Sequence, residues 1–365
     1  MQIKEVCAAL DTWAPLAFQE SYDNVGLLVG DPNIHVTGVL VTLDVTDEVL
    51  TEAKERGCNL VVAHHPVLFK GLKKITGGHA VERLVIRAIK EDIALYASHT
   101  NLDSVQHGVS VEMAKRLSLE NIRILQPQKN RLQKWEILVP NSHKEVVLEA
   151  LFEAGAGQIG AYDSCSFTVN GQGSFRPLAG ANPFLGKVNT LEKVEEVMIQ
   201  VLVPSHLSKN MEKAMKKAHP YEEVAYFVSV LENVHQEVGF GAIGELVDPM
   251  EASDFLVYLK DKMRVHVIRH TAICKDKIRR VAVCGGAGVG LLSTAKAVGA
   301  DVFISADFKY HDFFEADKQL IIADIGHFES EQFTKDVIVN YLSKNFTNFV
   351  THLSQVETNL ITYFV

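Results

Sequence analysis

The chain has 365 residues, more than one ordinary hydrophobic core of roughly 100–200 residues, so we expect two or more domains. Hydrophobic residues make up 47% of the chain, a share that is normal for folded globular proteins and excludes a mainly disordered one. The 36 Lys and Arg residues are outnumbered by 45 Asp and Glu residues, which gives a net charge of -9. This acidic balance, without a long basic run, argues against nucleic acid as a partner.

The N-terminus and the cysteines bear on location. The first residues, MQIKEVCAALDTWAP, lack the basic start and long apolar stretch of a secretory signal. No run of about 18 apolar residues is present, so the sequence predicts no membrane partner. The five cysteines form no CxxC pair, which fits reduced thiols and a cytoplasmic protein.

Strand and helix patterns alternate in the first segment, residues 1–130. The periodicity predicts helices at Ile3–Trp13, Thr46–Arg56 and Val81–Lys90, and strands at Val39–Leu43, Leu60–Ala63 and Ile93–Ala97. Thr46 or Asp47 is the expected cap of the second helix, and Gly57 is its expected stop. The alternation predicts the first half of an α/β core with a largely parallel sheet.

The middle segment, residues 131–235, has a different order: strand, helix, several strands, helix and strand. The predicted strands are Lys134–Pro140, Ser164–Asn170, Gly173–Pro177, Val194–Val203 and Glu223–Leu231, and the predicted helices are Ser142–Ala154 and Ser205–Ala218. Of these, Ser164–Asn170 and Gly173–Pro177 are expected to pair as a hairpin. This order is typical of a ferredoxin-like α+β domain, and its polar flanks indicate domain borders.

The last segment, residues 236–365, returns to an α/β pattern. Its predicted helices are Ser253–Met263, Leu291–Val298 and Phe328–Leu342, and its predicted strands are Lys277–Cys284, Val302–Ser305 and Gln319–Ala323. The predicted fold is therefore an α/β core formed by the N- and C-terminal segments, with an inserted ferredoxin-like α+β domain.

Three predicted strands end in side chains that bind metals. In chain order these are His64 with His65, His99 with Asp103, and His327 with Glu331. Because the ligand crevice of a parallel sheet lies beyond the carboxyl ends of its strands, we expect these groups to meet. Each histidine taken alone is more often a packed or surface residue, but three such strand ends in one sheet favour a metal site. Imidazole with carboxylate suits Zn, Mn, Fe or Ni, and bridging carboxylates suit a pair of divalent cations, Mg included.

Seven segments of the sequence resemble the Nif-three-like family of dinuclear metal proteins, often labelled GTP cyclohydrolase I type 2 homologues. They are SYDNVGLLVG (Ser21–Gly30), VVAHHP (Val61–Pro66), SHTNLD (Ser98–Asp103), GFGAIGEL (Gly239–Leu246), VAVCGGAG (Val281–Gly288), ISADFKYHD (Ile304–Asp312) and DIGHFESE (Asp324–Glu331). The resemblance implies two divalent metal cations per chain, held at the positions of His64, His65, Asp103, His327 and Glu331. The match to Glu331 would bridge the two metals.

The middle segment is similar to the insertion of one subgroup, which has a PII/CutA-like fold. Its HPYEEVAYF (His219–Phe227) carries this likeness, although its His219, Glu222 and Glu223 could also bind metal or shape a turn. The resemblance further implies a homo-oligomer, expected to be a hexamer. Folds of this kind serve both small-ligand sensing and trimer formation.

Other polar residues have two interpretations each. His99 and His311 are candidate catalytic residues that could transfer protons. They could instead be extra metal ligands or make structural hydrogen bonds. Asp23 and Asp44 could orient ligands or cap helices, and capping is the favoured interpretation for Asp44. The turn GGAGVG (Gly285–Gly290) has the wrong spacing for a dinucleotide fingerprint, so we expect close packing there.

Two functions follow from these patterns. The first is a metal-dependent hydrolase acting on an unknown small-molecule substrate, in which two cations activate water and polarise a phosphoryl or carbonyl oxygen. The family label implies GTP ring opening. The alternative is a non-enzymatic metal-binding or regulatory oligomeric scaffold, with a small-ligand-sensing inserted domain. An open coordination position would distinguish an enzyme from a closed structural site.

Overall fold

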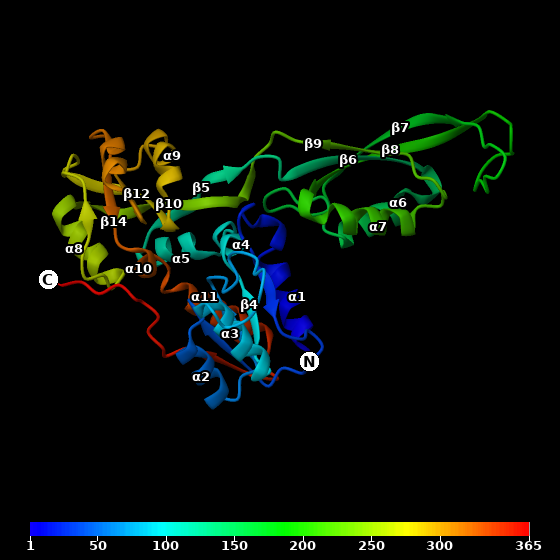
Figure 1. The fold of residues 1–365 in the computed structure, drawn as a ribbon. Helices are drawn as coiled ribbons and strands as arrows, with labels where there is room; N and C mark the ends of the chain where they lie inside the picture. The colour runs from blue at the N-terminus through cyan, green and yellow to red at the C-terminus, as the bar shows by residue number, and fades with distance from the viewer. Residues whose placement is uncertain (365) are drawn as a thin grey trace. The chain divides into compact units, whose positions relative to one another are not determined.

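The computed structural model describes residues 1–364 and divides the chain into two units (Figure 1). One unit combines residues 1–127 with the chain from residue 236 onward, and the other holds residues 128–235. The sequence-predicted borders lie after residue 130 and before residue 236. The fold is mixed α/β with several sheets. All five cysteines are free thiols, and within residues 1–364 no helix is long and apolar enough to cross a membrane.

Four strands of the N-terminal segment and one strand from near the C-terminus form a five-stranded sheet in the order β1-β4-β3-β2-β15. In chain order the strands are β1 (Gly26–Val29), β2 (Gly38–Thr42), β3 (Leu60–Ala63), β4 (Ala94–Ala97) and β15 (Val350–Leu353). β4, β3, β2 and β15 are parallel to one another, whereas β1 is antiparallel to β4. The helices packed on this sheet are α1 (Ile3–Trp13), α2 (Asp47–Glu55), α3 (Ala80–Lys90) and α11 (Thr334–Asn345).

Both faces of this sheet are covered, which explains its continuous apolar strands. Val39 and Val41 of β2 face one buried cluster with residues of α1 and α11, and Leu40 faces another with residues of α2 and α3. Successive strand residues point to opposite faces. Burying each of these side chains contributes about 1.5–3 kcal/mol.

The C-terminal segment forms a six-stranded sheet in the order β11-β14-β13-β12-β10-β5. In chain order the strands are β5 (Glu120–Gln128), β10 (His235–Glu251), β11 (Arg269–His270), β12 (Lys277–Ala287), β13 (Val302–Ala306) and β14 (Ile321–Asp324). β12, β13 and β14 are parallel, and β10 and β11 are antiparallel to their partners β12 and β14. The helical segments packed on this sheet are α5 (Val109–Arg116), α8 (Ala252–Lys262), α9 (Leu292–Ala297) and the 3-10 helix η5 (Tyr310–Ala316).

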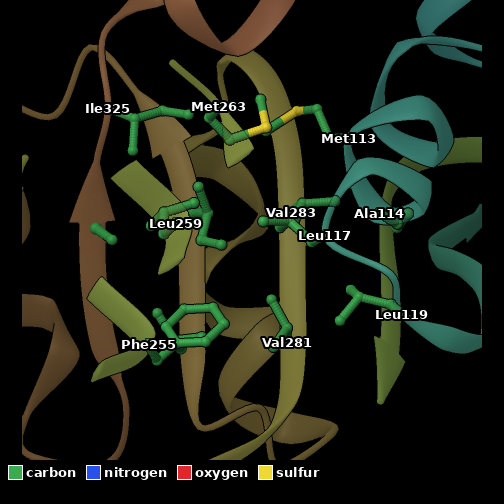
Figure 2. Packing of buried hydrophobic residues seen from close by; sticks show 14 of the residues in the cluster. Met113, Ala114, Leu117, Leu119, Phe255, Leu259, Met263, Val281, Val283 and Ile325 are labelled. Atoms are coloured by element: carbon green, nitrogen blue, oxygen red, sulfur yellow. The ribbon is translucent and has the colours of Figure 1, made fainter. Parts of the chain in front are cut away.

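Figure 2 shows the core on one face of the second sheet, where Phe255 and Leu259 of α8 lie in one cluster with Val281 and Val283 of β12. Met113, from α5, belongs to the same cluster. The opposite face is covered by α9 and η5. Each sheet is therefore the middle layer of three.

Each half of the chain gives one strand to the sheet of the other half. β5 precedes the inserted unit but lies beside β10 in the second sheet, and β15 lies near the C-terminus but pairs with β2 in the first. The Tyr341 hydroxyl of α11 also donates to the Ala9 carbonyl of α1. These exchanges join two segments that are far apart in sequence into one unit. Short elements of the same unit are α4 (Thr100–Asp103), α10 (His327–Glu331), η1 (Leu16–Phe18) and η4 (Val289–Leu291).

The inserted unit has one antiparallel sheet of four strands in the order β7-β8-β6-β9. Its elements in chain order are β6 (Leu132–Pro140), η2 (Asn141–His143), α6 (Lys144–Glu153), β7 (Ser166–Phe175), β8 (Glu192–Pro204), η3 (Ser205–Leu207), α7 (Ser208–Ala218) and β9 (Tyr226–Val230). Ile137 of β6 and Ile199 of β8 pack with Leu151 of α6 and Met215 of α7, so both helices lie on one face of the sheet.

Two predicted arrangements were wrong, although the predicted strand and helix types were right. Ser164–Asn170 and Gly173–Pro177 do not form a hairpin, because most of both ranges lies in β7, one continuous strand that pairs with β8 over its whole length. The predicted helix Phe328–Leu342 is two helices, α10 and α11. Gln332 and Phe333 lie between the two helices; Phe333 is buried in the core, and the Gln332 side chain donates to the Met263 carbonyl. The predictions did not include β1, β5, β10, β15 or α5.

Candidate metal centre

The candidate ligands lie beyond the carboxyl ends of strands in both sheets of the larger unit. His64 and His65 follow β3. Asp103 is the last residue of α4, which follows β4. His327 and Glu331 begin and end α10, which follows β14. The first sheet thus supplies three of these side chains and the second sheet two.

Glu331 lies between the histidines of the two halves. Its Oε2 is 2.9 Å from His65 Nε2 and 3.2 Å from His327 Nε2, while its Oε1 is 3.8 Å from His64 Nε2. The side chain is only 3% exposed. One carboxylate oxygen therefore faces His64 and the other faces His65 and His327, which is the arrangement that a bridging ligand requires.

Two buried atoms of the cluster have no hydrogen-bond partner among the described residues: His64 Nε2 and Asp103 Oδ1. They lie 3.8 Å apart, too far for a hydrogen bond. His64 Nδ1 donates to the Ser98 carbonyl at 2.8 Å, so its Nε2 carries the free lone pair. A buried polar atom without a partner is costly. A cation between these atoms would satisfy both, so the residues present fit a metal ion.

Two groups of side chains bring their ligand atoms within 4.8 Å of one another, and both include His65. One contains His64 and His99, and the other contains His327 and Glu331. His99, which the sequence offered both as an extra metal ligand and as a catalytic candidate, has its ligand atom close to those of His64 and His65. Its ring centre is 5.2 Å from that of His64.

Each of three histidines donates through Nδ1 to a carboxylate, which leaves Nε2 directed elsewhere. The pairs and their distances are His65 with Asp44 (2.7 Å), His99 with Asp23 (2.9 Å) and His327 with Asp307 (2.7 Å). A carboxylate behind a histidine fixes its tautomer and raises its strength as a metal ligand. This pattern therefore supports a metal role for the Nε2 atoms.

The structure corrects the interpretation of Asp44 as a helix cap. The cap of α2 is Thr46, whose hydroxyl accepts from the Val49 amide. Asp44 instead accepts hydrogen bonds from His65 and, at 2.7 Å, from the Thr358 hydroxyl. Asp307 was not identified from the sequence as a site residue. Its place after β13, beside β14 in the sheet, is what brings it to His327.

The protonation of the cluster reflects its crowding. Burial lowers the pKa of His65, but hydrogen bonds to Asp44 and Glu331 outweigh it and raise that pKa to about 10. The bond to Glu331 raises the pKa of His327 to about 9. Burial raises the pKa of Glu331, yet its histidine neighbours lower it well below its usual range. Protons thus hold these side chains together in the metal-free protein, and a cation would have to displace them.

The acids at the edge of the cluster differ. Burial raises the pKa of Asp103. Burial also raises the pKa of Asp23, but hydrogen bonds from His99 and Thr100 outweigh it and lower that pKa. Asp23 therefore stays ionised behind His99.

Gly286 on β12 lets the second sheet approach the cluster. Its φ of 61° is in the left-handed region, and an added Cβ would collide with Glu331 Oε1 and lie 3.3 Å from His327 Cε1. The Gly286 amide donates to the Ser330 hydroxyl at 2.9 Å. The glycine-rich turn serves close packing against the candidate ligands, as its spacing predicted.

His311 lies apart from this group. It is exposed on η5, where its ring contacts are with Tyr310 and Phe314. A catalytic role for His311 stays a prediction.

The fold and the site define a class: an α/β protein in which two distant chain segments meet at a cluster of histidines and carboxylates that could hold metal. The chain belongs to the Duf34/NIF3 (NGG1p interacting factor 3) family, whose model matches residues 1–360. This confirms the family that the sequence motifs indicated.

Relatives of known name or structure match the whole chain. The GTP cyclohydrolase 1 type 2 homolog of Bacillus subtilis (strain 168) is 37% identical over 366 residues, covering 99% of this chain and 98% of that protein. The protein of the same name from Staphylococcus aureus (strain COL) is 33% identical over 369 residues, covering 100% of both chains. A crystal structure described as a Bacillus cereus protein related to NIF3 aligns with a TM-score of 0.86 and 36% identity, covering 100% of this chain and 99% of that one.

Proposed function

We propose that this protein binds two divalent cations and acts as a metal-dependent hydrolase. The observation that supports it most directly is the position of Glu331, with one carboxylate oxygen toward His64 and the other toward His65 and His327. In this proposal His64 and Asp103 would hold one cation, His65 and His327 would hold the other, and Glu331 would be shared between them. His99 lies close enough to His64 and His65 to complete either set.

The exposure of the cluster favours an enzyme over a closed structural site. The side chains of His65 and His327 are 23% and 36% exposed, although Glu331 between them is buried. A substrate could therefore reach this side of the cluster. Structural metal sites are usually closed by protein ligands, whereas catalytic sites keep a position open. The non-enzymatic scaffold is the alternative, and it predicts metal binding without turnover.

Divalent cations, when bound, supply Lewis acidity and activation of water. The chain's own residues supply proton handling and orientation. His99 Nδ1 donates to Asp23, so its Nε2 is the atom that can take up or release a proton. Asp44 and Asp307 hold His65 and His327 in the tautomer that presents Nε2.

The names of the relatives suggest a nucleotide substrate, since both are called GTP cyclohydrolase 1 type 2 homologs. The cluster itself fits attack on a phosphoester, a nucleotide ring or a cyclic amide. These three classes form the substrate screen.

The test measures metal content and hydrolysis with and without added Mn or Zn. Glu331→Gln keeps the shape of the side chain and removes the bridging charge, so we expect lower metal content and a large loss of rate. Glu315→Gln is the matched control, because Glu315 is exposed on η5 and its replacement changes the charge of the protein by the same amount. Metal content should also fall in His65→Ala. Metal-dependent turnover that survives Glu331→Gln would refute the proposed mechanism, and metal binding without turnover would favour the scaffold.

We also propose that the inserted unit is a ferredoxin-like domain of the PII/CutA-like kind. Its element order β6-α6-β7-β8-α7-β9 and its strand order β7-β8-β6-β9 support this, as do two helices on one face. The order is that of a split βαβ arrangement.

A third proposal is that the protein is a homo-oligomer, namely a hexamer. It rests on the family resemblance, and closed symmetric assemblies are common among oligomers. Light scattering at micromolar protein should give six times the mass of the 365-residue chain. A monomeric mass would contradict it.

A further inference from the structure

A cavity of about 370 Å³ lies within the inserted unit, far along the chain from the candidate metal ligands. It borders the sheet and the connection between β7 and β8. Leu138 and Glu196 line it, whereas their neighbours Val139 and Val197 belong to the core beneath α6 and α7. Because strand residues alternate between faces, the cavity lies on the sheet face opposite the two helices.

A buried carboxylate lines the cavity. Glu196 is only 9% exposed, and its Oε1 accepts a hydrogen bond from the Tyr221 hydroxyl at 3.0 Å. The other oxygen of this carboxylate, Glu196 Oε2, lies beside Gly173. Gly173 on β7 makes room for this oxygen, since a Cβ at that position would collide with it. A carboxylate that lines a cavity favours a ligand that brings a positive charge and a hydrogen-bond donor.

The HPYEE segment, which the metal site does not use, builds one wall of the cavity. Tyr221, Glu222 and Glu223 line it. His219 fixes the segment, because its Nε2 donates to the Leu138 carbonyl at 2.9 Å and its Nδ1 accepts from the Tyr221 amide at 3.1 Å. The Glu222 carboxylate accepts from the Asn182 amide at 2.9 Å, which ties the β7–β8 connection to the same wall.

Charge and ring content define the chemistry of the cavity. Three carboxylates line it (Glu196, Glu222 and Glu223) against one guanidinium (Arg176), a net charge of -2. The aromatic rings of Phe175, Phe184 and Tyr221 also line it, with the Tyr221 ring 6.1 and 6.2 Å from the other two. Apolar walls bind a flat body, and both carboxylates and aromatic rings attract a cation.

We propose that this cavity binds a small organic cation, in which a protonated amine or amidinium group on a flat apolar body donates to Glu196 Oε2. The volume lies within the range of small-molecule sites, roughly 300–1,000 Å³. The proposal does not depend on the hydrolase function, because every lining residue belongs to the inserted unit.

The experiment titrates the full chain with benzamidinium chloride and follows the ligand by NMR. Benzamide, which is neutral, and benzoate, which is an anion, have the same ring and serve as matched probes on the unaltered protein. We expect benzamidinium to bind at least about tenfold more tightly than benzamide, because only the cation makes a charged hydrogen bond. We expect benzoate not to bind.

Variants then locate the site. Glu196→Gln should weaken benzamidinium binding by about tenfold or more, since it removes the charge of the acceptor. Glu195→Gln is the control, because Glu195 is the exposed neighbour on the same strand and makes the same change in charge. Equal binding of benzamide and benzamidinium, or full affinity in Glu196→Gln, would overturn the proposal. The comparison of the three probes uses the unaltered protein, so it tests the proposal even if a variant folds poorly.

Discussion

Replacing Asp44 by Asn would test whether the carboxylate behind His65 serves the metal site. Asp44 Oδ1 accepts from His65 Nδ1 and Oδ2 accepts from the Thr358 hydroxyl, both at 2.7 Å. The amide oxygen of Asn can still accept from His65, and the Thr358 hydroxyl can turn to accept from the amide nitrogen. The substitution therefore keeps the shape and both contacts but removes the negative charge.

The expected loss follows from that charge. A charge-assisted hydrogen bond is roughly twice as strong as a neutral one, and it makes His65 a better ligand. Removing such a partner usually lowers metal affinity by about 10–100-fold, or about 1.4–2.7 kcal/mol. The Asp44 side chain is 36% exposed, and solvent screens part of its charge, so we expect a loss nearer tenfold.

The assay is competition for Zn between the metal-free protein and a chelator of known affinity. Asp47→Asn is the matched control, because Asp47 lies three residues from Asp44 and its side chain is 59% exposed. This substitution removes the same charge. We expect unchanged affinity there. Equal Zn affinity in Asp44→Asn and the unaltered protein would show that His65 does not bind metal through the oriented Nε2.

Three further predictions concern the fold. Leu259→Ala should lower the free energy of unfolding, measured by urea denaturation, by about 2–5 kcal/mol, because Leu259 is fully buried in the core shown in Figure 2. Val257→Ala on the same helix is the control and should cost little, because Val257 is 70% exposed. Equal losses in the two variants would contradict this packing. Glu82 accepts from the Thr76 amide and hydroxyl and the Gly78 amide, and these bonds lower its pKa from 4.5 to about 2. The ionised Glu82 carboxylate thus contributes fully to stability above pH 4.5, and this contribution is lost as the pH falls toward 2. The difference in unfolding free energy between the metal-free protein and Glu82→Gln should therefore shrink over that pH range. A constant difference would show that the hydrogen bonds of Glu82 do not stabilise the fold. Joining Asn130 to Gln236 with a short Gly-Ser linker should leave a folded unit that still binds Zn, since 1–127 and the chain from 236 form one unit; aggregation or complete loss of metal would count against this border.

Local patterns predicted many elements because their causes are local. The apolar spacing of Ile3–Trp13 and the apolar run of Leu60–Ala63 gave α1 and β3 at the bounds that the structure has. Periodicity reports which face is buried, and burial is what stabilises these elements. The prediction failed where a neighbouring strand, and not the local pattern, determined the path of the chain. β7 passes through Gly171 and Gly173 without turning because β8 pairs with it on both sides of them.

The sequence by itself determined the kind of chemistry at the site. His64, His65, Asp103, His327 and Glu331 each lie at the end of a strand or on the helix after it, and this placement predicted a cluster of candidate metal ligands drawn from both ends of the chain. The expectation that all of these strands belong to one sheet was wrong, because β3 and β4 lie in the first sheet and β14 lies in the second.

Only the tertiary structure decided how these side chains are arranged. Asp307 reaches His327 because β13 and β14 are neighbours, and Asp44 reaches both His65 and Thr358 although 314 positions separate it from the latter. The same holds for Glu196 and Tyr221, which enclose a cavity that no local pattern reveals. Sequence periodicity records which face of an element is buried, but the atoms that meet across two elements depend on the packing of the whole chain.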